Sequence, residues 1–453
     1  MRREILLLPV LAGLCIFSLR AGAQEMTAPN PAAPAGGNPT PPPGTLPAPT
    51  ASQPQGTNQN AGGFMTQGLM TGDWGGWRKK LADDGFTFTP TYVGEVMGNP
   101  SGGARQGVIY EGLLDLPLNF DLGKMDDSLA DTIIYADALE IHGPGLSQHF
   151  VGDFSNTSGI AAYNTLRLDE VWIQKLFWDK KLSVKVGNIA IDTEFVQSSS
   201  AALFVGSTFG TFTLIANNLP GGGPSYPLAV PAVRVSLTPI PEFYVMAGVY
   251  GQDDRINQAV NDQNGTLFSL NERDGMLIMS ETGFLLNQEP SNTGLQGTYR
   301  LGSFVHTDDT PTWAGGNGGT GYGVYGVMDQ QLYAKDNRVI SLFVRSGGAP
   351  SNTNFVDYYV DGGFNFTGFV PGRANDVAGI AVARSHVSSD FSDAQVAAGK
   401  LPLTAETVIE ATYKVQLAPW WSVQPDFQYI VTPSGVEGSH NAVVLGLRTS
   451  VAF

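Results

Sequence analysis

The chain has 453 residues, with 25 Lys and Arg against 41 Asp and Glu, which gives a formal net charge of −16 at pH 7. This acidic balance argues against a nucleic-acid partner, because binding to phosphates needs clustered basic side chains. Charged residues make up 15% of the chain, whereas a soluble domain usually carries about a quarter. After the N-terminus no segment has the roughly eighteen consecutive apolar residues of a spanning helix, which excludes a helical membrane protein.

The N-terminus predicts export. Arg2 and Arg3 precede an apolar stretch at residues 5–17, and Ala21-Gly22-Ala23 offers a small-x-small cleavage site. Together these are the parts of a secretory signal peptide, which we expect over residues 1–23. The single Cys lies inside it, so the exported chain has no disulfide to stabilise it.

Two short regions are expected before the main domain. Residues 24–66 are rich in Pro, Ala and Gly and predict a flexible periplasmic arm. Residues 67–84 predict a short helical segment, with its helix beginning near Trp74.

From residue 85 to residue 453 the dominant period is two, and the last strand shows it best. One of its faces carries Val443, Leu445, Leu447, Thr449 and Val451; the other carries Val444, Gly446, Arg448, Ser450 and Ala452. This alternation suits a wall between lipid and water. A terminal aromatic residue, Phe453, also resembles the assembly signal of outer-membrane barrels. Residues 130–142 and 166–177 show no clean alternation.

The predicted fold is therefore all-β: a transmembrane antiparallel β-barrel over residues 85–453, in a Gram-negative-type outer membrane. Its length leaves room for roughly sixteen to eighteen strands joined by short periplasmic turns and long extracellular loops, and a barrel of that size encloses an aqueous channel. A soluble secreted β-rich binding protein is the alternative fold. It differs in leaving the folded chain soluble without detergent.

Polar side chains on the inferred inner face are the candidate channel residues. Carboxylates, Arg and amides suit the hydroxyls of a sugar, and aromatic rings suit its C–H faces. The candidates are Glu111, Asp115, Trp172, Arg234, Arg300, Arg345, Glu410, Lys414, Asp426 and Arg448. Phe195 and Phe204 are further aromatic candidates. The alternative role of these side chains is to brace the wall of a water-filled barrel.

Residues 198–218, rich in Ser, Gly and Phe, predict either a constriction loop folded inward or an ordinary external loop. Asp253-Asp254 and Asp308-Asp309 are candidates for Ca²⁺ binding or for solvated loop charge. The five His residues show no metal-ligand spacing, and there is no Gly-x-Ser-x-Gly motif or phosphate loop. We expect no enzymatic activity, cofactor or metal, although a hydrolase site assembled in space is a remaining alternative.

Several segments resemble the carbohydrate-selective porins of the OprB type. They are LMTGDWGGWR (residues 69–78), LDEVWIQ (168–174), LSVKVGNIAIDTEF (182–195), GVYGVMDQQLY (323–333), GRAND (372–376) and residues 406–453. The resemblance implies a sixteen-stranded barrel that passes glucose-like sugars by passive diffusion. The long Pro/Ala-rich arm departs from the family pattern.

The expected partners are sugars as transported solutes, together with outer-membrane lipid and lipopolysaccharide. A homotrimer and a monomer both stay open. The alternative function is a general or ion-preferring diffusion porin without a site for sugars.

Overall fold

The computed structural model describes residues 63–219, 222–251, 263–266, 268, 275–289 and 292–453. The predicted signal peptide and most of the predicted arm lie outside the described residues, as does Asp253-Asp254. Within the described residues, no helix is long and apolar enough to cross a membrane.

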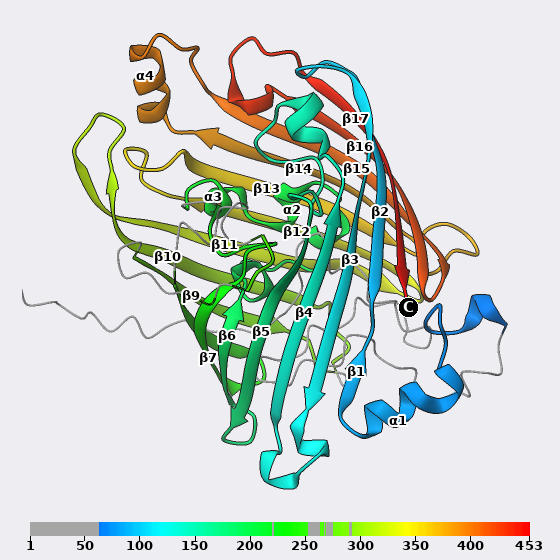
Figure 1. Cartoon of the computed structure of the whole chain (residues 1–453). Helices are drawn as coiled ribbons and strands as arrows, with labels where there is room; N and C mark the ends of the chain where they lie inside the picture. Colours follow the sequence, from blue (N-terminus) through cyan, green and yellow to red (C-terminus); the bar gives the residue numbers. More distant parts are fainter. Residues whose placement is uncertain (1–62, 220–221, 252–262, 267, 269–274, 290–291) are drawn as a thin grey trace, which may run out of the picture.

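A closed antiparallel barrel is the core of the fold (Figure 1). Each strand from β2 to β17 pairs with its neighbours in the chain, and β17 pairs back onto β2 to close the ring. The strands are β2 (Thr91–Ser101), β3 (Gly107–Asp121), β4 (Thr132–His142), β5 (Thr165–Phe177), β6 (Leu182–Ile189), β7 (Val230–Ile240), β8 (Phe243–Gly251), β9 (Met276–Leu286), β10 (Gly297–Pro311), β11 (Asn317–Lys335), β12 (Arg338–Gly348), β13 (Val356–Thr367), β14 (Val377–Val387), β15 (Ala405–Ala418), β16 (Trp421–Val431) and β17 (Ala442–Ala452). The prediction of an antiparallel barrel of about sixteen strands is confirmed.

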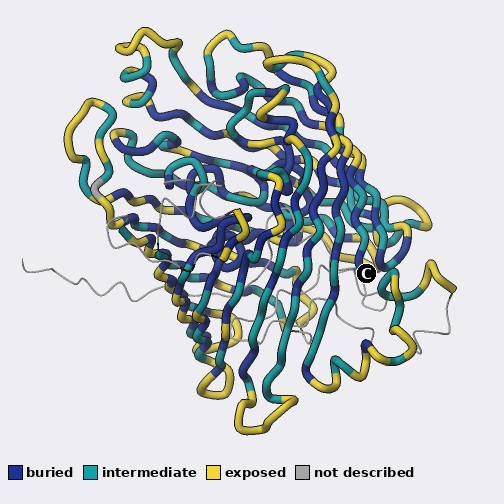
Figure 2. Tube along the Cα trace, in the orientation of Figure 1, coloured by how far each residue is buried: buried dark blue, intermediate teal, exposed yellow. Residues whose placement is uncertain are grey.

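The two-sided wall follows the predicted alternation (Figure 2). On β17, Leu445 and Leu447 are 53% and 51% exposed on the outside, whereas Arg448 is 1% exposed and points inward. Closure of the barrel gives the backbone N–H and C=O groups of every strand a hydrogen-bond partner, because lipid offers them none. The contrast between an apolar outside and a polar inside therefore determines which side chains of each strand face lipid and which face the interior.

The unclear alternation at residues 130–142 and 166–177 has a structural cause. On β4 the apolar Leu139 and Ile141 face inward, where they form a cluster with Ile160 of the following loop, while Glu140 and His142 lie on the outer face. The ladder between β4 and β5 also contains a register shift between Ala136 and Ala138. A bulge of this kind changes which residues of a strand face inward and interrupts a period of two.

The N-terminal segment is fastened to the end of the chain. The helix α1 (Trp77–Asp83) lies below the C-terminus in Figure 1, and β1 (Phe86–Phe88) pairs with β3. Arg78 donates to the carbonyl of Phe453 (3.1 Å) and to that of Phe88 (3.2 Å). The amide of Met70 donates to the carbonyl of Ala452 (2.9 Å). These hydrogen bonds attach the N-terminal segment to the seam of the barrel, where β17 pairs with β2.

The opposite end carries the long connections. The helix α4 (Ser389–Ala397) stands in the connection between β14 and β15, and α2 (Ser207–Gly210) and α3 (Thr213–Ala216) belong to the connection between β6 and β7. Short helical turns complete the described elements: η1 (Phe64–Thr66), η2 (Trp74–Gly76), η3 (Leu122–Lys124), η4 (Asp127–Leu129), the π-helix η5 (Ser147–Val151), η6 (Ile191–Thr193), η7 (Ala201–Leu203) and η9 (Pro433–Gly435).

Candidate functional site: a constriction built by two loops

The connection between β6 and β7, which we call the inner loop (residues 190–229), folds into the barrel (Figure 1). Most of its described side chains between Ala190 and Ile215 are buried, although such a loop on the outside of a barrel would be solvated. Of the two possibilities that the sequence left open for residues 198–218, the structure shows the inward one.

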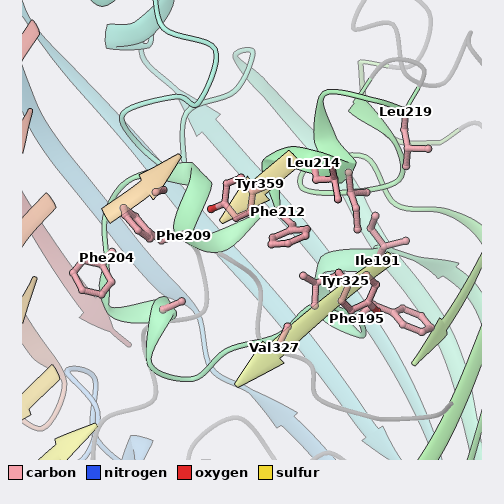
Figure 3. Close-up of a cluster of buried hydrophobic side chains, with 14 of the residues drawn as sticks. Ile191, Phe195, Phe204, Phe209, Phe212, Leu214, Leu219, Tyr325, Val327 and Tyr359 are labelled. Carbon is pink, nitrogen blue, oxygen red and sulfur yellow. The ribbon is translucent and has the colours of Figure 1, made fainter. Parts of the chain in front are cut away.

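An aromatic cluster attaches the inner loop to one side of the barrel (Figure 3). The ring of Phe212 lies 4.5 Å from that of Tyr359 on β13 and 6.1 Å from that of Tyr325 on β11. Phe204 lies 5.7 Å from Phe343 on β12. Each fully buried aromatic side chain contributes about 1.5–3 kcal/mol, so this side of the loop is firmly held.

Wall side chains also bind the backbone of the inner loop. The carboxylate of Glu410 accepts hydrogen bonds from the amides of Val205 (2.5 Å) and Gly206 (3.0 Å). Arg345 donates to the carbonyls of Thr208 (2.9 Å) and Gly210 (3.2 Å). Loop backbone that leaves water needs such partners, and here the wall supplies them.

Further bonds hold the beginning of the inner loop. Arg300 donates to the carbonyl of Gln197 and lies 3.5 Å from Asp329, whose other oxygen accepts from Ser198 (2.7 Å). Arg234 forms a buried ion pair with Glu194 at 2.9 Å. Charge-assisted bonds of this kind are about twice as strong as neutral ones, so the loop is anchored along its length.

A second connection, the outer loop (residues 143–164, between β4 and β5), covers the inner loop. The amide of Gly159 donates to the carbonyl of Val205 (2.9 Å), and the amide of Ser207 donates to the carbonyl of Asn156 (3.1 Å). Gln428 of β16 donates to the carbonyl of Thr157 (2.8 Å). The two loops therefore narrow the barrel together, against the wall formed by β16, β17, β2 and β3.

That wall carries a strip of hydrogen-bond acceptors, which we call the acceptor strip: Glu95, Glu111, Asp426 and Gln428. Glu95 and Glu111 face each other across the β2–β3 ladder, and Arg448 of β17 donates to Glu95. Among the described residues, Glu95 Oε2, Glu111 Oε1, Asp426 Oδ1 and Gln428 Oε1 are buried and have no hydrogen-bond donor. A buried acceptor without a donor is costly, so these four atoms favour a hydrogen-bond donor beside them.

The family model of the carbohydrate-selective porins, OprB family, matches residues 105–453. The chain belongs to this family. This porin is 28% identical over 425 residues to Porin B of Pseudomonas aeruginosa, covering 85% of this chain and 91% of that one. It is 24% identical over 419 residues to the putative porin QuiX of Acinetobacter baylyi, covering 85% and 93%.

A solved structure supports the same assignment. The high-pH structure of Pseudomonas putida OprB matches this porin with a TM-score of 0.78 at 27% identity, covering 86% of this chain and all of that one. The protein is therefore an outer-membrane β-barrel channel. The family also confirms the expectation that it is not an enzyme.

The structure divides the candidate channel residues of this porin into two groups. Four of them bind the inner loop or its anchors: Arg234, Arg300, Arg345 and Glu410. Three lie on the wall that carries the acceptor strip: Glu111, Asp426 and Arg448. A polar residue on an inward face can serve either use, and only the path of the loops separates them.

The remaining candidates have other surroundings. Asp115 is buried on β3, and Lys414 is half-buried near the periplasmic end of β15. Trp172 lies between Tyr135, at 4.9 Å between ring centroids, and the ammonium of Lys185, at 3.8 Å. Phe195 and Phe204, which the sequence offered as sugar contacts, belong instead to the buried cluster behind the inner loop.

Sequence reasoning missed Glu95. The neighbouring inward residues on β2, Val93 and Met97, are apolar. The sequence pattern of β2 therefore did not indicate a polar inner face. The signal that could have found it is its register opposite Glu111, which only strand pairing provides.

Proposed function

We propose that this porin passes neutral sugars of monosaccharide size by passive diffusion, and that the acceptor strip guides them through the constriction. Its outer face contacts outer-membrane lipid and lipopolysaccharide. The observation that supports the sugar path is the set of four buried acceptors without donors on one wall. Sugar hydroxyls donate hydrogen bonds and satisfy such atoms, whereas simple anions cannot.

The charge of the strip sets a second preference. Three of its four members are carboxylates, and Glu95 is paired with Arg448. The remaining negative charge repels anions in a narrow, partly dehydrated passage. We therefore expect sugar acids to enter more slowly than neutral sugars of the same size.

The test compares Glu111→Gln with Glu437→Gln, a matched control because Glu437 is exposed in the connection between β16 and β17. The glucose concentration that half-blocks the ion current is measured in planar bilayers. Loss of one acceptor for a sugar hydroxyl costs about 0.5–1.5 kcal/mol, so Glu111→Gln should raise this concentration roughly 2- to 12-fold. Glu437→Gln should leave it unchanged, and an equal response of the two variants would remove the strip from the sugar path.

An ion-preferring porin is the second candidate, and the acidic strip favours it because carboxylates attract cations. The same recording separates the two functions. If glucose at high concentration left the current of the wild-type channel unchanged while cations permeated far faster than anions, the channel would be ion-preferring.

A further inference from the structure

One carboxylate ties two extracellular loops to the rim of the barrel. Glu406, at the beginning of β15, accepts hydrogen bonds from the amides of Phe154 (3.0 Å) and Ser155 (2.9 Å) of the outer loop. It also accepts from the amide of Ser434 (2.6 Å), in the connection between β16 and β17. Glu406 thus sets the position of the outer-loop segment that leads directly to the contacts of Asn156 and Thr157 at the constriction.

A second carboxylate, that of Asp153, lies beside it. Both oxygens of Asp153 are buried, and this burial raises the pKa of the carboxyl more than its hydrogen bond with Ser147 lowers it. Asp153 precedes Phe154, and its negative charge acts directly on Glu406. Two buried carboxylates that lie side by side without a cation cannot both stay ionised cheaply.

The elements packed around the pair offer no basic side chain to neutralise it within the described residues. Arg105 directs its Nε to the carbonyl of His149 (2.5 Å), and His149 places its Nδ1 3.1 Å from the carbonyl of Gly145. The other titratable groups near the pair on these elements are Glu437 and His440, both exposed, and Asp357 and His386, which pair with each other at 2.6 Å. Arg384 of β14 is exposed and donates to the hydroxyl of Thr407 (3.0 Å). A proton on the pair is the remaining way to relieve the repulsion.

We propose that Asp153 and Glu406 form a proton-dependent latch that positions the outer loop at the constriction. With a shared proton the loop stays docked; when both carboxylates are ionised they repel, and the outer loop releases its contacts with Val205 and Gln428. This proposal rests on the channel function of the family and not on the proposed preference for sugars.

The pH range follows from the burial of Asp153, which raises the pKa of its carboxyl from 3.8 to about 6. Because the docked form holds the proton more tightly, docking is strongest below pH 3.8 and weakens as the pH rises through about 6.

The test is liposome swelling at pH 4.5 and 7.5 with neutral sugars of graded size. For the wild-type porin we expect the rate for a trisaccharide, relative to glucose, to rise severalfold from pH 4.5 to pH 7.5. Asp153→Asn should keep the low ratio at both pH values, because an amide does not ionise. Asp390→Asn, an exposed position on α4, is the matched control and should behave as the wild type.

Two results would overturn the latch: a wild-type ratio that is equal at both pH values, or a rise that persists in Asp153→Asn. Heat-dependent gel mobility checks that each variant is folded at both pH values. If Asp153→Asn fails to fold, a titration of the wild-type ratio decides alone, since the latch predicts a ratio that rises as the pH increases above about 4 and a flat curve contradicts it. Loss of the sugar preference with an intact pH response would affect only the proposed sugar path.

Discussion

Substitution of Glu410 by Gln tests whether the wall holds the inner loop in place. The carboxylate of Glu410 uses both of its oxygens, one for the amide of Val205 and one for the amide of Gly206. Gln keeps the size of the side chain but replaces one acceptor with an NH₂ group, which cannot accept a hydrogen bond. One backbone amide is then left unpaired in a buried site, which costs about 1–3 kcal/mol.

This cost should appear locally, because the aromatic cluster of Phe212 and Tyr359 holds the following residues independently. A loss of about 1–3 kcal/mol corresponds to roughly 5- to 150-fold faster amide hydrogen exchange at residues 203–208, with little change at residues 212–216. Hydrogen exchange with mass spectrometry on the folded barrel measures both segments. Unchanged protection at Val205 and Gly206, with Glu437→Gln as the control, would refute the assignment of Glu410 as an anchor.

Two further predictions concern stability. Arg345→Met leaves the buried carboxylate of Asp361 without its cation, so we expect a loss of about 3–5 kcal/mol. The loss is measured as a lower urea midpoint for loss of the folded gel mobility, and a midpoint within error of the wild type would contradict this. Arg78→Leu removes the bonds to Phe453 and Phe88 at the seam, so the temperature at which the folded form is lost should fall while single-channel conductance stays unchanged. A changed conductance would instead place the N-terminal segment in the solute path.

Some interactions at the constriction could not be predicted from the sequence because they join residues far apart in the chain. The hydrogen bond between Glu410 and Val205 joins residues that are 205 positions apart in the chain, and the one between Glu406 and Ser155 joins residues that are 251 positions apart. Composition identified the polar inner face, but no local pattern tells which inward carboxylate binds a loop and which borders the solute path. The sequence therefore predicted the same role for the loop anchors Arg345 and Glu410 as for Glu111 of the acceptor strip.

The sequence by itself determined the barrel, because a wall between lipid and water requires a period of two, and the alternation of β17 carries that requirement without any knowledge of its neighbours. It could not determine the constriction. Leu139 and Ile141 of β4 face inward and pack against Ile160 of the outer loop. Apolar residues therefore occupy the inner face there, and the pattern of polar inside and apolar outside is lost. Only the tertiary structure decided which inward side chains bind the loops. A loop that folds into the barrel changes the partners of a side chain without changing the sequence pattern of its strand.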